Sequence, residues 1–245
     1  VWTAAGSGLR RCTMLFPDLQ PKRGTLPEGI DLRCCDVVEV LGVASGARLV
    51  TADPPWIYSQ APGVADPSLQ YDVLKMPEIA GVVNWAADCA DPDGCRLALW
   101  NTWPQLGEWV EVTVGMGKEW RWGRILSGGS WHKSGPGGVG YHWIGDSEPV
   151  LLYKVGAPPC GRWDSLKNAH NSAREDHSAK PMEWMRGWLR RWTDPGDLVL
   201  DLYAGLGSVA VACALEGRRY IGAEIDPERH RRAVLRVEEA YNNRR

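Results

Sequence analysis

The feature that most limits the possible folds is a glycine turn late in the printed sequence, in the run DLYAGLGSVA (residues 201–210). The apolar stretch before Asp201 is typical of a strand, and the stretch after Gly207 is typical of a helix. Glycines allow a sharp turn between the two, and the free N–H groups of the helix N-terminus can then face a ligand. The run therefore predicts a strand, a turn and a helix that bind a small molecule.

A second acidic residue indicates what this unit binds. Glu224 ends the next apolar stretch, YIGAE, and lies 224 − 201 = 23 residues after Asp201. A carboxylate at about this distance commonly binds the hydroxyl pair of a ribose, so we predict a nucleoside site. Gly205, Gly207 and Ala210 also fit the dinucleotide pattern GxGxxA, which makes an NAD-dependent oxidoreductase an alternative.

The position of this unit predicts an unusual strand order. Only 245 − 224 = 21 residues follow Glu224, and their pattern is that of one helix. The other strands must then come from earlier in the chain, which argues against the oxidoreductase. We expect an α/β protein with a circularly permuted Rossmann-like fold, in which a mostly parallel, doubly wound sheet has helices on both faces.

The earlier stretch TADPPWIY (residues 51–58) contains a second candidate site. Two consecutive prolines end the preceding strand because each lacks an N–H and has a fixed φ. The chain is therefore stiff where it leaves the carboxyl edge of the sheet, where open α/β folds bind ligands. The Asp53 carboxylate beside the rings of Trp56 and Tyr58 suits a planar, hydrogen-bonding substrate such as a nucleobase. The alternative is a proline-rich turn with a capping aspartate.

Hydrophobic patterns predict the remaining elements. We expect helices at 37–43, 76–87, 182–192 and 228–243, and strands at 95–102, 108–116 and 148–156. Residues 1–28 have little periodicity and are expected to form an irregular arm, which leaves 29–245 as one domain.

Residues 117–140 differ from the rest of this domain because basic residues alternate with tryptophans over a glycine-rich backbone. Aromatic faces stack on bases, and cations bind phosphates, so the segment is predicted to be a nucleic-acid-contacting insert. A surface hairpin with partly buried tryptophans is the alternative. The candidate contact residues are Lys118, Arg121, Trp122, Arg124, Trp131 and Lys133.

Composition limits the other possibilities. The net charge is −2, so any nucleic-acid surface must be a local patch. The seven cysteines show no CxxC spacing, which predicts reduced thiols and no metal site. No apolar run approaches the roughly 18 residues of a membrane span. We expect a cytoplasmic protein without membrane contact, present as a monomer or homodimer.

Three motifs together resemble one family: DPPW (53–56), HSAKP (177–181) and DLYAGLGS followed by GAEID (201–208 and 222–226). Their combination is similar to the S-adenosylmethionine-dependent N6-adenine methyltransferases, in the order of the β group of DNA amino-methyltransferases. DPPW with HSAKP most resembles the branch related to the mRNA adenosine methyltransferases, which includes bacterial and phage DNA enzymes. The resemblance spans about residues 30 to 240.

The resemblance implies S-adenosylmethionine as cofactor and assigns residues to it. Glu224 would bind the ribose hydroxyls and Asp36 the adenine amine, although Asp36 also suits a helix N-cap. His177, Ser178 and Lys180 match a segment near the methionine carboxylate and amine. The methionine part would lie against the turn residues Asp201, Tyr203, Ala204, Gly205, Gly207 and Ser208.

The resemblance also implies a substrate, an adenine extruded from double-stranded DNA. Asp53 and the Pro54 carbonyl would accept hydrogen bonds from the N6 amine, Pro55 would stiffen the loop, and Trp56 with Tyr58 would stack on the base. An RNA N6-adenosine methyltransferase would use the same pocket. A catalytically inactive nucleic-acid-binding scaffold is a further alternative, against which the intact motifs argue.

Overall fold

The computed structural model describes residues 26–56, 74–134, 146–159, 161, 166–173 and 179–244. The predictions for most of the N-terminal arm and for Tyr58, His177, Ser178 and residues 135–140 lie outside these ranges. No helix in the described ranges has both the length and the apolar character needed to cross a membrane.

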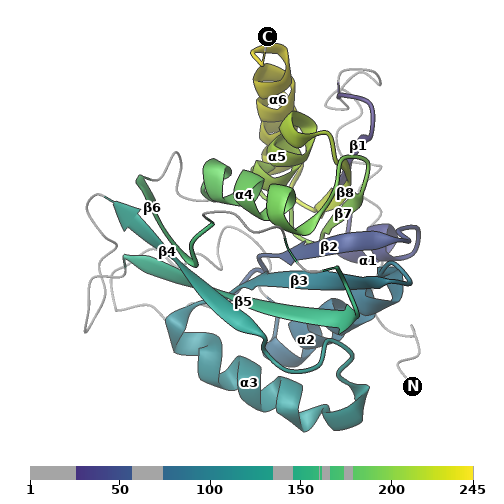
Figure 1. The fold of residues 1–245 in the computed structure, drawn as a ribbon, viewed down its shortest axis with the longest axis vertical. Coiled ribbons are helices and arrows are strands. Elements are labelled where there is room, and N and C mark those ends of the chain that lie inside the picture. Colours follow the sequence, from purple (N-terminus) through teal and green to yellow (C-terminus); the bar gives the residue numbers. More distant parts are fainter. Residues whose placement is uncertain are drawn as a thin grey trace.

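One eight-stranded sheet forms the centre of the molecule, in the order β1-β8-β7-β2-β3-β5-β4-β6 (Figure 1). All its pairs are parallel except those that β5 makes with β3 and β4, so the expected mostly parallel sheet is confirmed. The strands are β1 (Ile30–Cys34), β2 (Ala47–Ala52), β3 (Gly94–Trp100), β4 (Ser127–Ser134), β5 (Ser147–Gly156), β6 (Ala169–Ala173), β7 (Leu198–Asp201) and β8 (Arg219–Glu224).

Helices cover both faces of this sheet, as expected (Figure 1). One apolar cluster packs beneath the first three helices, α1 (Val37–Leu41), α2 (Met76–Trp85) and α3 (Leu106–Gly115). A second cluster packs beneath the last three, α4 (Met182–Trp192), α5 (Ser208–Glu216) and α6 (Pro227–Asn242). The tryptophans account for much of this second core: the Trp100 ring lies 5.8 Å from that of Trp184 and 5.7 Å from that of Trp188.

The pairing of β2 with β7 joins the two candidate sites. These strands are parallel, and Thr51 of β2 lies opposite Asp201 of β7. Parallel neighbours end at the same edge of a sheet, so the DPPW stretch after β2 and the glycine turn after β7 lie side by side. The expectation that strands from earlier in the chain complete the sheet beside the glycine-turn unit is therefore confirmed.

The strand predicted at 108–116 is wrong, because α3 occupies this segment. Its alternating apolar residues also fit a helical period: Trp109 and Thr113, one turn apart, are buried, whereas Val110 and Val114 are exposed. The Trp109 indole donates a hydrogen bond of 2.8 Å to the Tyr153 hydroxyl. The segment is helical because the Trp109 ring packs into the core, and this packing outweighs the β-propensity of the valines.

The second half of the predicted insert also belongs to the sheet. Residues 127–134 form β4, which pairs with β5 on one side and β6 on the other. These residues are therefore part of the central sheet and not of a separate insert, and the contact of this strand with nucleic acid stays a prediction.

Candidate active site

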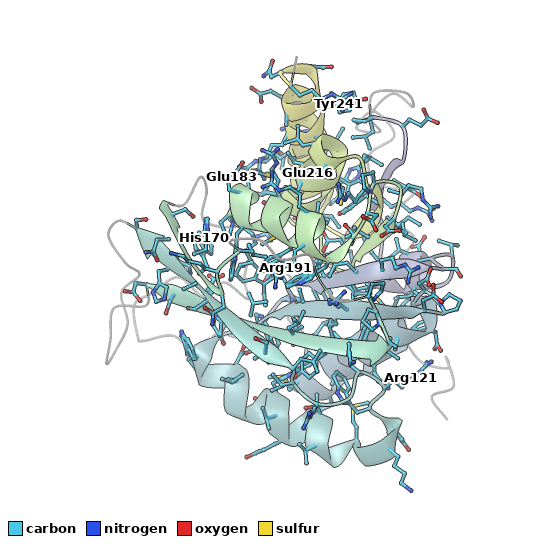
Figure 2. All side chains as sticks on the ribbon, viewed as in Figure 1. Arg121, His170, Glu183, Arg191, Glu216 and Tyr241 are labelled. Carbon is cyan, nitrogen blue, oxygen red and sulfur yellow. The ribbon has the colours of Figure 1, made fainter. Side chains whose placement is uncertain are left out.

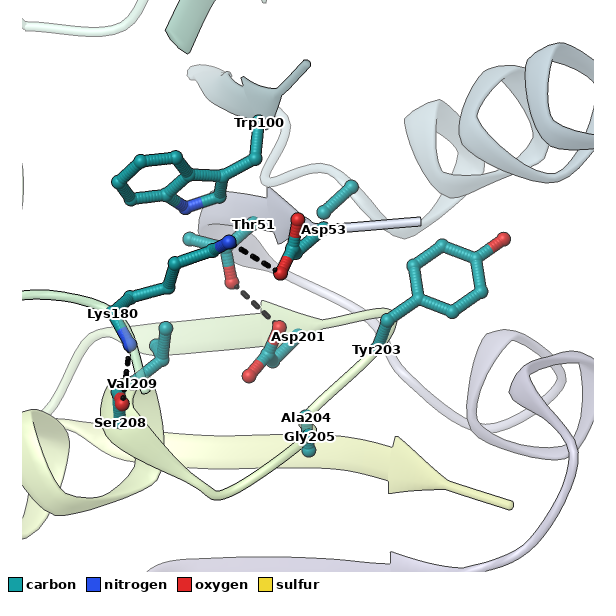
Figure 3. Close-up of a pocket in the computed structure, with 11 residues that line it drawn as sticks. Thr51, Asp53, Trp100, Lys180, Asp201, Tyr203, Ala204, Gly205, Ser208 and Val209 are labelled. Atoms are coloured by element: carbon teal, nitrogen blue, oxygen red, sulfur yellow. Dashed lines mark hydrogen bonds and ion pairs between the residues drawn. The ribbon is translucent and has the colours of Figure 1, made fainter. Parts of the chain in front are cut away.

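A small pocket lies at the carboxyl ends of β2, β3 and β7 (Figure 3). It brings together residues that are distant in the sequence: the start of DPPW, the end of HSAKP and the glycine turn. Its lining residues are Thr51, Ala52, Asp53, Trp100, Lys180, Asp201, Tyr203, Ala204, Gly205, Ser208 and Val209.

Lys180 is the centre of an ion cluster in this pocket. Its Nζ lies 2.8 Å from Oδ2 of Asp53 and 2.9 Å from Oε2 of Glu148. Lys133 pairs with the other oxygen of Glu148, so two cations neutralise two carboxylates. The Nζ atom also lies 4.7 Å from the centroid of the Trp100 ring, within the range of a cation–π interaction.

The charges of this cluster stabilise one another. Burial alone would lower the pKa of Lys180, but Asp53 and Glu148 outweigh it and raise that pKa. Burial would likewise raise the pKa of Glu148, but Lys180 and Lys133 lower it to about 2. Burial raises the pKa of Asp53, and the Lys180 ammonium limits this rise. Lys180 and Glu148 are therefore both charged at neutral pH.

Asp201 lies at the base of the pocket and connects three strands. Its Oδ1 accepts a hydrogen bond from the Thr51 hydroxyl, and its Oδ2 accepts one from the Tyr220 hydroxyl, each at 3.0 Å. The side chain is buried, and desolvation raises its pKa to about 7 despite these two bonds. Each of its oxygens thus has a partner within the protein.

The two glycines of the turn have different structural roles. Both have positive φ, +54° at Gly205 and +73° at Gly207. A Cβ on Gly205 would meet no atom within 4 Å, whereas one on Gly207 would lie 2.9 Å from Cβ of Ala233 in α6. Gly205 therefore leaves space in the pocket, and Gly207 allows two helices to pack closely.

Glu224 holds the turn in place from the end of β8. Its Oε2 accepts a hydrogen bond of 2.8 Å from the Gly205 N–H, and its Oε1 accepts one of 2.9 Å from the Asp226 N–H. Burial raises its pKa. Each carboxylate oxygen has a further lone pair, so the predicted ribose contact is compatible with this arrangement.

Asp36 caps a helix, as its alternative interpretation suggested. Its side chain accepts a hydrogen bond of 3.0 Å from the Val38 N–H at the start of α1. The neighbouring Cys35 N–H donates to the Glu224 carbonyl oxygen at 3.1 Å, so Asp36 lies near the end of β8. Its contact with the cofactor adenine stays a prediction.

The stacking role predicted for Trp56 is contradicted by its burial. Only 2% of this residue is exposed, and its ring packs edge-to-face against Trp109, with centroids 6.1 Å apart. The ring is thus part of the core and offers no open face to a base. The Pro54 carbonyl accepts a hydrogen bond of 2.8 Å from the Trp56 N–H, which leaves one lone pair for a substrate. Pro55 is half-buried beside it.

The tryptophans predicted to contact nucleic acid are also in the interior. Trp122 is fully buried, and its indole donates to the Val83 carbonyl oxygen at 2.7 Å. Trp131 is 2% exposed, and its indole donates to the Ser172 hydroxyl at 3.0 Å. The prediction is therefore wrong for both, because their rings fill the core on either side of the sheet.

The basic residues of this set divide into three groups. Lys133 pairs with Glu148 next to the pocket. Arg121 pairs with Asp88, which precedes β3, so it lies at the sheet edge opposite the pocket. Figure 2 shows Arg121 near the end of β5, the strand that runs antiparallel to β3. Lys118 and Arg124 are exposed, and their contact with nucleic acid stays a prediction.

Five residues of the site were not predicted from the sequence: Thr51, Ala52, Trp100, Glu148 and Val209. Thr51 and Trp100 look like ordinary strand residues, and only the pairing of strands places them in the pocket. Glu148 had a detectable signal, since it is a carboxylate directly before the apolar run PVLLY (149–153). Its partner could not be identified without the position of β5 in the sheet.

The fold and the pocket at the carboxyl edge define an α/β protein of the methyltransferase type, and solved structures support this class. The PvuII DNA methyltransferase (cytosine-N4-specific) has a TM-score of 0.63 and 16% identity, with 90% of this chain and 95% of that chain covered. TTHA0409, a putative DNA modification methylase from Thermus thermophilus in complex with S-adenosyl-L-methionine, has a TM-score of 0.62 and 20% identity, with 87% and 96% covered. These likenesses establish the fold.

Sequence comparisons show that part of the chain is similar to DNA methyltransferases. Residues 146–235 match the N6_N4_Mtase family, described as DNA methylase. The type II methyltransferase M.Cfr9I of Citrobacter freundii is 43% identical over 58 residues, which are 24% of this chain. The match spans only 19% of that relative's length. The family segment includes Glu148, Lys180, the glycine turn and Glu224, whereas Asp53 lies outside it.

Proposed function

We propose that the protein transfers a methyl group from S-adenosylmethionine to the N6 amine of adenine in double-stranded DNA. The observation that supports this most strongly is the shared pocket of Asp53 and the glycine turn. Asp53 provides a hydrogen-bond acceptor for an amine. The glycine turn provides the space and the polar groups expected of a nucleoside site.

The residues around the turn fit such a cofactor. Gly205 leaves open space beside the carboxylate of Glu224. The buried hydroxyl of Tyr203 has no hydrogen-bond partner among the described residues, so it is available to a ligand. The Glu224 carboxylate beside this space has a further lone pair on each oxygen, which suits the hydroxyl pair of the cofactor ribose. S-adenosylmethionine, when bound, supplies a methyl group on a cationic sulfur.

Asp53 positions the target amine. Its carboxylate and the free lone pair of the Pro54 carbonyl accept hydrogen bonds from the two N–H groups, which directs the nitrogen lone pair away from the ring. Holding the reacting atoms in this geometry removes much of the entropic barrier. Asp53 is too weak a base to deprotonate an aromatic amine beforehand, so the proton leaves to water after transfer.

Cytosine N4 methylation is the second candidate. It is favoured by the likeness to the PvuII enzyme, whose name specifies cytosine N4, and by the family label that covers both amines. The two products differ in the base that carries the methyl group, and an RNA substrate would yield N6-methyladenosine with ribose.

Analysis of the methylated product tests the proposal. The protein would be incubated with S-adenosylmethionine and bacterial genomic DNA or total RNA, and the digested nucleosides would be identified by mass spectrometry. We expect N6-methyldeoxyadenosine. N4-methyldeoxycytidine would establish the second candidate, N6-methyladenosine from RNA alone would establish an RNA enzyme, and no methylated base from any polymer would contradict the proposal.

A further inference from the structure

Asp53 and Lys180 form a pair of hydrogen-bonding groups with opposite roles. An acceptor oxygen of Asp53 lies 2.8 Å from the donor nitrogen of Lys180, and both residues line the pocket. An ammonium has three N–H groups, and Asp53 and Glu148 use two of them among the described residues. A carboxylate likewise has lone pairs beyond the one that Lys180 uses. The pair can therefore present one acceptor and one donor to a third group.

Such a pair matches one kind of base edge. In adenine, the exocyclic amine is a donor, and the adjacent ring nitrogen N1 is an acceptor; in cytosine, the amine lies beside the acceptor N3. On the Watson–Crick edge of guanine, the amine lies beside the N1–H, so two donors would face the pair. In thymine, an oxygen acceptor lies beside an N–H, which reverses the required order. Enzymes that modify extruded bases commonly recognise this edge.

We propose that Lys180 donates a hydrogen bond to the ring nitrogen next to the target amine while Asp53 accepts from the amine, and that Glu148 positions Lys180 for this contact. The inference rests on the proposed function and narrows its substrates to bases whose Watson–Crick edge has an exocyclic amine beside an unprotonated ring nitrogen.

The surroundings of Lys180 fix it in the required place. Its backbone N–H donates to the Ser208 hydroxyl at 3.2 Å, and its ammonium lies over the Trp100 ring. Glu148 binds the ammonium together with Asp53 and is itself held by Lys133. Side-chain exposure is 15% for Lys180 and 21% for Glu148, so neither charge is freely solvated. The raised pKa of Lys180 keeps it a donor at neutral pH.

A substitution of one atom in the substrate tests the contact. Two DNA duplexes would differ only at the target base, which is adenine in one and 1-deazaadenine in the other. The analogue keeps the amine but replaces N1 with C–H. For the wild-type protein we expect kcat/KM to be about 10- to 100-fold lower on the analogue, the loss typical of a hydrogen bond to a charged group. If the methylated base is cytosine, 3-deazacytosine makes the same comparison.

The same comparison with Lys180→Met separates recognition from a structural role. If Lys180 contacts N1, the variant methylates both duplexes with similar kcat/KM. If Lys180 only supports the fold, both rates fall together and the ratio between substrates stays that of the wild type, which would overturn the inference. Calorimetry of S-adenosylmethionine binding and the thermal unfolding midpoint would show that the variant is folded.

Glu148→Gln tests the positioning role. We expect it to reduce the discrimination between the two duplexes, because Lys180 loses one of the two carboxylates that fix its ammonium in the pocket. The matched control is Glu183→Gln, which removes an exposed ion-paired carboxylate on α4 (Figure 2) and should keep wild-type discrimination. Unchanged discrimination in Glu148→Gln would reject its positioning role.

The outcome also separates this inference from the proposed function. A wild-type protein that methylates adenine and 1-deazaadenine equally contradicts the contact alone. A wild-type protein that methylates neither adenine nor cytosine contradicts the proposed function, and the inference fails with it.

Discussion

Asp201 shows how one buried carboxyl group can connect a binding site to the stability of the fold. It accepts hydrogen bonds from Thr51 of β2 and Tyr220 of β8, the strands on either side of its own. The glycine turn begins two residues later. A charge on Asp201 is unfavourable because the group is desolvated, so the neutral acid stabilises the folded state.

This environment predicts a pH dependence of stability. The pKa of Asp201 is raised from 3.8 to about 7 on folding. The stabilisation is complete below pH 3.8 and is lost as the pH rises through about 7, by roughly 4 kcal/mol. Asp201→Asn keeps a donor and an acceptor but cannot ionise, so its free energy of unfolding should fall less over this range. Urea unfolding between pH 4 and pH 8 measures this, and equal slopes for variant and wild type would contradict it.

The turn between β7 and α5 shows how one element serves two purposes. Gly207 lies against α6, and Gly205 faces the open part of the pocket. Both need a backbone conformation that costs other residues roughly 1–2 kcal/mol. A side chain at Gly207 would in addition clash with α6, whereas one at Gly205 would not.

Alanine at each position should therefore have a different main effect. Gly207→Ala is expected to lower the free energy of unfolding by about 1–3 kcal/mol more than Gly205→Ala, because its Cβ would lie 2.9 Å from that of Ala233. Gly205→Ala is expected to weaken S-adenosylmethionine binding more than its loss of stability explains. Chemical denaturation and calorimetry measure the two effects. The reverse order of stabilities would refute this description of the turn.

At the scale of the whole molecule, the two edges of the sheet have different roles. The pocket lies at the carboxyl ends of β2, β3 and β7, where the proposed function requires DNA to deliver a base. Arg121 and Asp88 lie at the other edge, where β3 begins. The original prediction that Arg121 binds nucleic acid is therefore replaced by the opposite expectation.

Arg121→Gln should leave DNA binding unchanged. Each lost phosphate contact would reduce the slope of log K against log salt concentration by about 0.9. Fluorescence anisotropy of a labelled duplex at several salt concentrations measures this slope. We expect the variant and the wild type to have the same slope. A slope lower by about 0.9 in the variant would show that Arg121 contacts a DNA phosphate.

The sequence predicted the parts of the site that depend on strand ends. Asp53 and the glycine turn each follow a strand, and parallel strands place their ends together without knowledge of any side-chain contact. Trp56 was misassigned because its burial depends on Trp109, whose helix was itself predicted as a strand. Glu148 was missed because its contact with Lys180 needs the position of β5 and the path of the chain before α4. Local sequence patterns give neither the position of β5 in the sheet nor the path of the chain before α4.

Replacement of Asp53 by alanine is the most direct test of the central claim, that this carboxylate holds the amine which receives the methyl group. The matched control is Asp93→Ala, which removes an exposed carboxylate paired with Arg48 just before β3. Transfer of a tritiated methyl group to DNA and calorimetric binding of S-adenosylmethionine would be measured for both. We predict that Asp53→Ala loses at least about 100-fold in methyl transfer while cofactor binding stays close to wild type, and that Asp93→Ala changes neither. Methyl transfer by Asp53→Ala at the wild-type rate would contradict the account.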